Sequence, residues 1–169
     1  SQPGFNEFQK EILGTNCKIW DISFRRSKPG NTGLYLHQDG VGQVNMAITL
    51  DDNLEGLGAT AVLSGSHLVP QSINQLKVEV PPAIVKLFSA FLAPLSGKVG
   101  DIVVFSNRIW HGRFENKSKT EHDVIFIGFF PDGYLYGKPW PQDLIKAFEG
   151  TTLGQLLACA EDVEYSIPS

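Results

Sequence analysis

Cysteine is scarce in this sequence. Cys17 and Cys159 are the only cysteines among 169 residues, and almost the whole chain separates them. This spacing is neither the dense cysteine framework of a small secreted domain nor a zinc-binding pattern. We therefore expect both thiols to be reduced, buried and not bonded to each other, in a reducing, cytoplasmic location.

Long apolar runs and clusters of positive charge are also missing. No uninterrupted apolar stretch approaches the roughly 18 residues of a membrane-spanning helix. The first four residues lack the basic-then-apolar order of a secretion signal. The formal charge is −4, and Arg25-Arg26 is the densest basic spot. We therefore expect neither a membrane nor a nucleic acid as a partner.

The composition is typical of one folded domain with many turns. Hydrophobic residues make up 42% of the chain and charged residues 19%, with 17 glycines and 10 prolines. These proportions exclude a disordered chain, a collagen and a coiled coil. A chain of 169 residues buries roughly 70% of its unfolded surface. We therefore expect a single domain over residues 1–169, with a core that needs no disulfide.

Short alternating segments dominate the middle of the chain. Trp20, Ile22 and Phe24 alternate with polar residues, which predicts a strand starting at Cys17 with these three side chains on its inner face. Further strands, rich in β-branched and aromatic residues and bounded by turn residues, are predicted at 34–37, 44–50, 59–63, 102–105 and 124–130.

Helical periodicity is confined to three places. It predicts a short helix at 6–13, a helix or a pair of turns at 83–92, and two short helices after 142, split at Gly150, with Thr151 or Thr152 capping the second. The fold class is therefore an all-β core over about 17–130, with a few flanking helices and a helical C-terminal tail at 141–162. Uneven connections between short strands favour a jelly-roll or cupin-like double sheet over βαβ units.

Two histidines and an aspartate have the spacing of a metal site. His37 and Asp39 lie at the end of a predicted strand, and alternation places both side chains on one face. His111 follows the predicted strand at 102–105. Two imidazoles and one carboxylate on one side of a metal leave its other side open, as in non-haem Fe(II) oxygenases. The alternative is that the histidines are ordinary surface groups.

Three short segments carry a further signal. They are Leu36-His37-Gln38-Asp39; the glycine-led strand 58–67, ending in Gly65-Ser66-His67; and 100–105, followed by His111-Gly112 and Asn116-Lys117-Ser118. In this order they resemble the phytanoyl-CoA dioxygenase family of Fe(II)- and 2-oxoglutarate-dependent oxygenases. The resemblance covers roughly residues 19–130.

The resemblance implies a double-stranded β-helix and an oxygenase-like domain. It implies that His37, Asp39 and His111 hold Fe(II) and that 2-oxoglutarate is the co-substrate. With dioxygen, 2-oxoglutarate would be converted to succinate and carbon dioxide while a C–H bond of a small-molecule substrate is hydroxylated. Three nearby motif residues are expected to lie outside the metal site: Gln38, His67 and Asp101.

The sequence departs from the family at the residue that binds the co-substrate. Relatives carry an arginine about nine to eleven residues past the distal histidine, where it pairs with the far carboxylate of 2-oxoglutarate. The corresponding residues here are Thr120, Glu121 and His122. A neutral histidine offers one donor where a guanidinium offers two parallel charged ones. The carboxylate anchor is therefore absent or moved.

Several residues are candidates to replace this anchor. We predict Arg113, because an extended segment places it on the same side as His111. The other candidate cations are Lys119, His122 and Arg26, which shares the expected inner face of Trp20, Ile22 and Phe24. Two polar residues on the strand after the first ligands, Asn45 and Thr49, are predicted to contribute an amide and a hydroxyl to co-substrate binding, unless they only form the wetter face of that strand.

The missing arginine leaves a rival function open. The chain would then be a metal-binding double-stranded β-helix module without oxygenase activity, acting in binding or assembly. It is short compared with most relatives, which is consistent with an excised part of a longer protein. An aromatic segment after the last strand, with Tyr134, Tyr136 and Trp140, would form a pocket wall or cap the barrel.

Overall fold

The computed structural model describes residues 7, 8, 10, 11, 17–39, 43–52, 58–68, 87, 89–95, 97–131, 140–151 and 154. The chain divides into two compact units, Ser1–Ile22 with Ile127–Ser169, and Ser23–Phe126. The metal-site candidates all lie in the second unit. A single domain over residues 1–169 stays a prediction.

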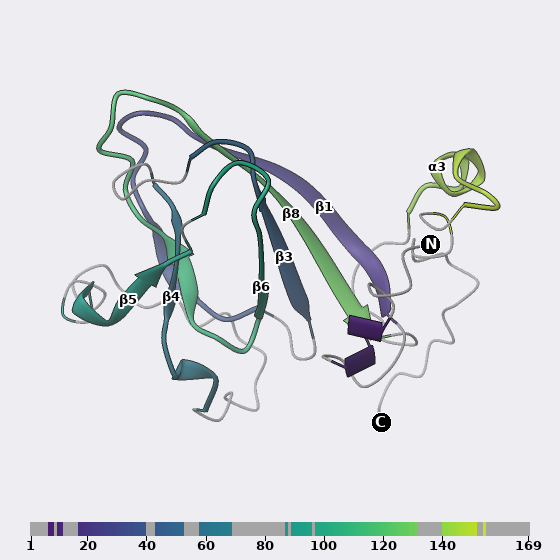
Figure 1. Cartoon of the computed structure of the whole chain (residues 1–169), viewed down its shortest axis with the longest axis horizontal. Coiled ribbons are helices and arrows are strands. Elements are labelled where there is room, and N and C mark those ends of the chain that lie inside the picture. The colour runs from purple at the N-terminus through teal and green to yellow at the C-terminus, as the bar shows by residue number, and fades with distance from the viewer. Residues whose placement is uncertain are drawn as a thin grey trace. The chain divides into compact units, whose positions relative to one another are not determined.

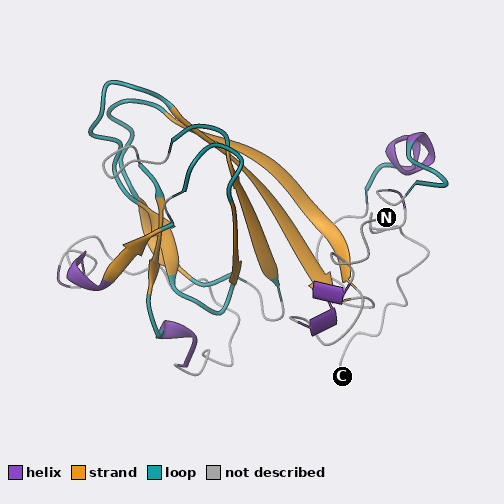
Figure 2. Ribbon diagram, viewed as in Figure 1, coloured by secondary structure: helices purple, strands orange, loops and turns teal. Residues whose placement is uncertain are grey.

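Strands dominate the described residues and form two four-stranded sheets (Figures 1 and 2). The first sheet has the order β1 (Cys17–Ser27), β8 (His122–Pro131), β3 (Val44–Thr49) and β6 (Ile102–Ser106). The second has the order β2 (Leu34–His37), β7 (His111–Arg113), β4 (Thr60–Leu63) and β5 (Leu92–Pro94). Apart from β4 and β5, successive strands alternate between the sheets. This is the winding of a double-stranded β-helix, which confirms the predicted all-β class.

Strand β1 buries the face opposite to the one predicted to be inner. Cys17 and Ile19 are 3% and 4% exposed, whereas Ile22 and Phe24 are 44% and 54% exposed. Apolar side chains occur on both faces of this strand, so alternation alone gives the period but not which face is inner. The prediction that Ile22, Phe24 and Arg26 face inward is therefore wrong.

The helical segments agree with the sequence only in part. Residues 7, 8, 10 and 11 are helical, within the predicted helix at 6–13. In the segment 83–92, predicted as a helix or a pair of turns, a 3₁₀ turn η2 (Ser89–Phe91) leads into the strand β5. Pro94 fits there because β5 is an edge strand, where a missing N–H costs least. No helix among the described residues is long and apolar enough to cross a membrane.

The C-terminal segment begins with helix α3 (Gln142–Ala147). Gly150 follows with a φ of +75°, a conformation that favours glycine and ends the helical path. Thr151 Oγ1 accepts a hydrogen bond from the N–H of Gly154 at 3.1 Å, as expected of a residue capping the next helix. The rest of the predicted tail lies outside the described residues, as do Tyr134, Tyr136 and Cys159.

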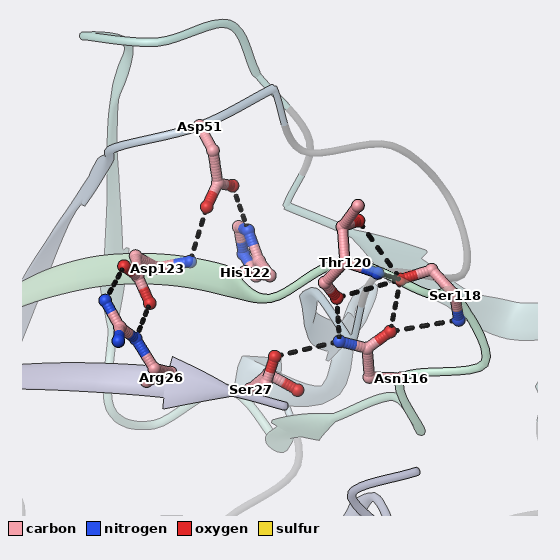
Figure 3. Close-up of polar contacts among 8 residues, drawn as sticks. All are labelled: Arg26, Ser27, Asp51, Asn116, Ser118, Thr120, His122 and Asp123. Atoms are coloured by element: carbon pink, nitrogen blue, oxygen red, sulfur yellow. Dashed lines mark hydrogen bonds and ion pairs between the residues drawn. The ribbon is translucent and has the colours of Figure 1, made fainter. Parts of the chain in front are cut away.

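The turn that leads into β8 is built around Asn116, which is 0% exposed. Its Nδ2 donates to the carbonyls of Ser27, at 2.8 Å, and Thr120, at 2.9 Å (Figure 3). Its Oδ1 accepts from the N–H and hydroxyl of Ser118 at 3.0 and 2.7 Å. The Asn116-Lys117-Ser118 triplet, which matches a glycosylation signal, is thus a structural turn whose asparagine side chain is buried.

Candidate metal centre

The two candidate histidine ligands lie opposite each other on paired strands. β2 and β7 are antiparallel neighbours, and His37 is in register with His111. Cross-strand partners project on the same face of a sheet, and the two ring centroids are 4.5 Å apart. The pairing of two strands whose histidines are 74 residues apart in the sequence therefore brings both imidazoles together.

The carboxylate of Asp39 lies against both rings. Asp39 Oδ2 is 3.2 Å from His111 Nε2, and Asp39 Oδ1 is 3.7 Å from His37 Nε2. One ligand atom from each of the three residues lies within 4.8 Å of the others. The side chain of His111 is 8% exposed, and those of His37 and Asp39 are about a quarter exposed. Two nitrogens and a carboxylate oxygen so arranged suit a divalent first-row metal with an open side.

The tautomer of His111 also fits a metal ligand. Its Nδ1 lies 2.9 Å from the carbonyl oxygen of Ile109. A carbonyl oxygen only accepts, so Nδ1 must carry the proton in this hydrogen bond. With this proton on Nδ1, the lone pair that a metal would take is that of Nε2, the atom that faces Asp39. Ligating histidines characteristically donate their second N–H in this way.

The short loop before His111 is held by two side chains from other parts of the fold. Gln38 Nε2 donates to the carbonyl of Arg108 at 2.5 Å. The hydroxyl of Ser66 accepts from the N–H of Trp110 at 2.8 Å. Gln38 is therefore directed away from the metal ligands, as alternation predicted, but it has a partner that the sequence did not reveal.

Ser66 belongs to the motif Gly65-Ser66-His67, for which the sequence drew attention to the histidine alone. In the structure His67 is exposed on the 3₁₀ turn η1 (Ser66–Leu68), outside the group of ligand atoms, whereas Ser66 is 5% exposed. A small hydroxyl residue after a turn glycine was the available signal. Asp101 serves the fold as expected, accepting from the N–H of Lys98 at 2.7 Å.

Arg113 is the cation on the ligand-bearing strand β7, two residues after His111. Its Nη2 donates to the carbonyl of Thr32 at 3.1 Å, while its Nε is buried without a hydrogen-bond partner. Among the described residues it makes no ion pair with a carboxylate. Burial, and secondly the charge of Arg25, lower the pKa of the Arg113 guanidinium. An anion bound here would offset both effects.

The other candidate cations are differently placed. Arg26 forms two hydrogen bonds with Asp123, at 2.8 and 2.7 Å (Figure 3). It also forms an ion pair with Glu121 at 3.1 Å. The buried ring of His122 pairs through Nδ1 with Asp51, which also accepts from the N–H of Asp123 at 2.6 Å. Lys119 is exposed. His122 does not belong to the described group of ligand atoms from His37, Asp39 and His111.

The polar residues of β3 are buried. Asn45 Nδ2 donates to Asn107 Oδ1 at 2.6 Å, and Asn45 Oδ1 accepts from Gln43 at 3.1 Å. Asn45 is in register with Phe105, whose ring lies edge-on to His111 with centroids 5.3 Å apart. Asn45 therefore lies on the same face of the sheet as Phe105, but its amide is already hydrogen-bonded to Gln43 and Asn107. Thr49 is 3% exposed at the end of the same strand. A role for either in co-substrate binding stays a prediction.

Comparison with known proteins decides the family. The profile of the family "Phytanoyl-CoA dioxygenase (PhyH)" matches residues 6–122, more than half of the chain. The chain belongs to the phytanoyl-CoA dioxygenase family. The match includes all three metal-site candidates and ends at His122, where the family's arginine was expected.

Relatives of this phytanoyl-CoA dioxygenase family member differ from it considerably in sequence. The dioxygenase af480 of Aspergillus fumigatus is 24% identical, over 89% of this chain and 49% of its own length. The chain thus spans about half the length of this curated relative.

Solved structures share the fold. The non-heme alpha ketoglutarate dependent carbocyclase SnoK from nogalamycin biosynthesis matches with a TM-score of 0.64 and 17% identity, over 78% of this chain and 56% of its own. EctD from S. alaskensis, solved with 2-oxoglutarate and 5-hydroxyectoine, matches with a TM-score of 0.61 and 18% identity, over 75% of this chain and 49% of its own. At this identity, the likeness establishes the double-stranded β-helix.

Proposed function

We propose that this protein is a non-haem Fe(II)- and 2-oxoglutarate-dependent dioxygenase that hydroxylates a C–H bond of a small molecule. One observation carries the proposal: His37 and His111 lie in register across β2 and β7 with the carboxylate of Asp39 against both rings. Membership of the family and the dioxygenase name of the relative support it.

Each of the site residues has a distinct role in this proposal. His37, Asp39 and His111 would hold the iron through two nitrogens and one oxygen, which leaves the rest of its coordination sphere for co-substrate and dioxygen. The iron, with 2-oxoglutarate and dioxygen, supplies the oxidising chemistry. Phe105 packs against the ring of His111 and limits the access of water to that ligand.

Arg113 would bind the far carboxylate of 2-oxoglutarate. It lies on the same strand as His111, is half-buried, and has an Nε donor without a partner. Leaving that carboxylate buried and unpaired would cost several kcal/mol, so a cation has to meet it. Arg113 is the cation on the ligand-bearing strand that makes no described ion pair.

Succinate release tests the proposal. The purified protein, loaded with Fe(II) under reducing conditions, would be supplied with 2-oxoglutarate and dioxygen, with and without panels of candidate substrates. We expect succinate to form in the parent and not in a variant with His37, Asp39 and His111 all changed to Ala. Equal succinate release from both proteins would refute the assigned site.

A metal-binding module without oxygenase activity is the second candidate. The observation that favours it is the pairing of His122, at the expected position of the family's arginine, with Asp51. Calorimetric titration of the metal-loaded protein with 2-oxoglutarate separates the two. Metal binding with no affinity for 2-oxoglutarate in either the parent or the Arg113→Ala variant would favour this module over the dioxygenase.

A further inference from the structure

We propose that Ser66 and Gln38 are positioning residues for His111. They fix the loop Arg108–Trp110, and through it the orientation and tautomer of the imidazole. This inference rests on the proposed metal site but assigns roles to two residues outside it. Neither side chain is a ligand, and they follow different strands of the fold, Gln38 after β2 and Ser66 after β4.

All six backbone polar groups of this three-residue loop have partners. The N–H groups of Arg108 and Ile109 donate to Ser106, to its hydroxyl at 3.3 Å and its carbonyl at 3.0 Å. The carbonyl of Arg108 accepts from Gln38, and that of Ile109 from the ring of His111. The N–H of Trp110 donates to Ser66, and its carbonyl accepts from the N–H of Leu63 at 2.8 Å.

The turn after β4 holds Trp110 from both sides of its backbone. Leu63, the last residue of β4, bonds to its carbonyl, and Ser66, three residues later, bonds to its N–H. Gly65 between them has a φ of +78°, which favours glycine and allows the chain to turn back. Because Ser66 is 5% exposed, water does not readily replace its hydroxyl if it is removed.

Gln38 connects the two halves of the metal site. It lies between the ligands His37 and Asp39, and its amide reaches the carbonyl of Arg108, three residues before His111. The first two ligands and the loop that carries the third are therefore tied directly together. A shift of either half would move the other, which keeps the three ligand atoms at a constant separation.

The consequence for the metal runs through the carbonyl of Ile109. That oxygen accepts the Nδ1–H of His111, which leaves the lone pair on Nε2 beside Asp39. If the loop is released, the carbonyl loses its place and the neutral ring is no longer held in one tautomer. Groups that orient a ligand in this way change metal affinity by roughly 10- to 100-fold.

Two measurements on Ser66→Ala and Gln38→Met, singly and combined, test the inference. Long-range proton–nitrogen NMR of the metal-free protein reports the tautomer of His111. We expect the Nδ1–H form in the parent and a mixture in the combined variant. In titrations with Co(II), each single variant should bind the ion about tenfold or more weakly than the parent does. The visible absorption of the bound ion should also change.

Two controls separate positioning from a general loss of stability. Ser64→Ala removes an exposed hydroxyl from the same turn and should change neither measurement. Ser66→Thr keeps the acceptor and should retain most of the Co(II) affinity that Ser66→Ala loses. The free energy of unfolding of each metal-free variant, measured in urea, shows how much of any effect is structural.

The inference is overturned if the parent lacks the Nδ1–H form, or if the combined variant keeps both the parent's tautomer and its Co(II) affinity. It is also overturned if Ser66→Thr behaves like Ser66→Ala. If the parent itself binds no Co(II), the proposed function fails, and the tautomer measurement still decides the role of Ser66 and Gln38.

Discussion

At the scale of single residues, Asp39 connects the two imidazoles of the candidate site. Its two oxygens lie 3.2 and 3.7 Å from the Nε2 atoms of His111 and His37. It is also the only anionic ligand of the three, so it supplies the charge that attracts a divalent cation. Its removal should therefore cost more affinity than the loss of a group that only supports a ligand.

Losing a residue that hydrogen-bonds to a metal ligand typically weakens metal binding by roughly 10- to 100-fold. We expect Asp39→Ala, which removes a ligand itself, to weaken Mn(II) binding by more than this. Calorimetric titration measures the affinity. In the parent, Mn(II) at 100 times its Kd should add about 2.7 kcal/mol to the free energy of unfolding, and a variant that binds more than about 100-fold more weakly should gain less than about 0.4 kcal/mol at that concentration. Full metal occupancy after all three ligands are changed to Ala would contradict the assignment.

Arg113 is the second residue on which the proposal depends. We expect Arg113→Lys to raise the 2-oxoglutarate concentration needed for half-maximal succinate release by about tenfold or more, because a lysine keeps the charge and loses the guanidinium fork. The Mn(II) affinity should stay nearly unchanged. Lys117→Ala, at an exposed cation that is not an anchor candidate, is the matched control. Unchanged turnover in Arg113→Ala would place the anchor elsewhere.

At the scale of secondary-structure elements, the start of β8 is fixed by side chains from neighbouring segments. Asn116 closes the turn before this strand. Asp51 pairs with the ring of His122 and accepts from the N–H of Asp123, the first two residues of β8. Arg26 of β1 also pairs with Asp123 (Figure 3). These contacts determine where the strand begins, at the position from which the family's arginine would reach the co-substrate.

Asn116→Ala should destabilise the fold through this turn. The change removes the amide that donates to the carbonyls of Ser27 and Thr120, of which only Thr120 keeps a second described donor, the hydroxyl of Ser118, and one buried unsatisfied group costs about 1–3 kcal/mol. We expect the free energy of unfolding in urea to fall by about 2–4 kcal/mol. Lys117→Ala, at an exposed position in the same turn, should change it little. Equal stability of the two variants would contradict the structural role of Asn116.

The pair between Arg26 and Asp123 should give stability a mild pH dependence. The hydrogen bond from Arg26, more than its charge, lowers the pKa of the Asp123 carboxyl. A carboxyl whose pKa is depressed by folding stabilises the folded state above its unfolded pKa of about 3.9, and loses this contribution as pH falls through the folded pKa.

We therefore expect Asp123→Asn to be slightly less stable than the parent at pH 7, since exposed pairs contribute little. The difference should shrink as pH falls below about 4. Urea unfolding at pH 7 and pH 3 measures it, with Asp143→Asn, on the exposed side of α3, as the control. A difference that persists at pH 3 would contradict the assignment of the effect to this pair.

At the scale of the whole molecule, the two cysteines test the expected compartment. Cys17 is 3% exposed on β1, and Cys159 lies outside the described residues. We expect thiol titration of the denatured, non-reduced protein to count two thiols per chain. A count of zero in a monomer would contradict both the expectation of two free thiols and the expected reducing location.

Local patterns in the sequence were enough for the fold class and for the candidate ligands. Strand positions follow from period-two alternation and turn residues, and these depend on neighbours within a few residues. The motif His37-Gln38-Asp39 with a later histidine gave the three residues that the structure brings together. The inner face of β1 could not be predicted, because Ile19 competes with Ile22 and Phe24 and only packing decides between them.

Tertiary structure alone decided how the site is held. The register of His37 with His111 depends on the pairing of β2 with β7, and the contacts of Gln38 and Ser66 cross 70 and 44 positions of the chain. Long-range hydrogen bonds leave no periodic trace in the sequence, because each needs only one suitable side chain at one position. The sequence by itself determined which chemical groups are available; the winding of the two sheets determined which of them meet.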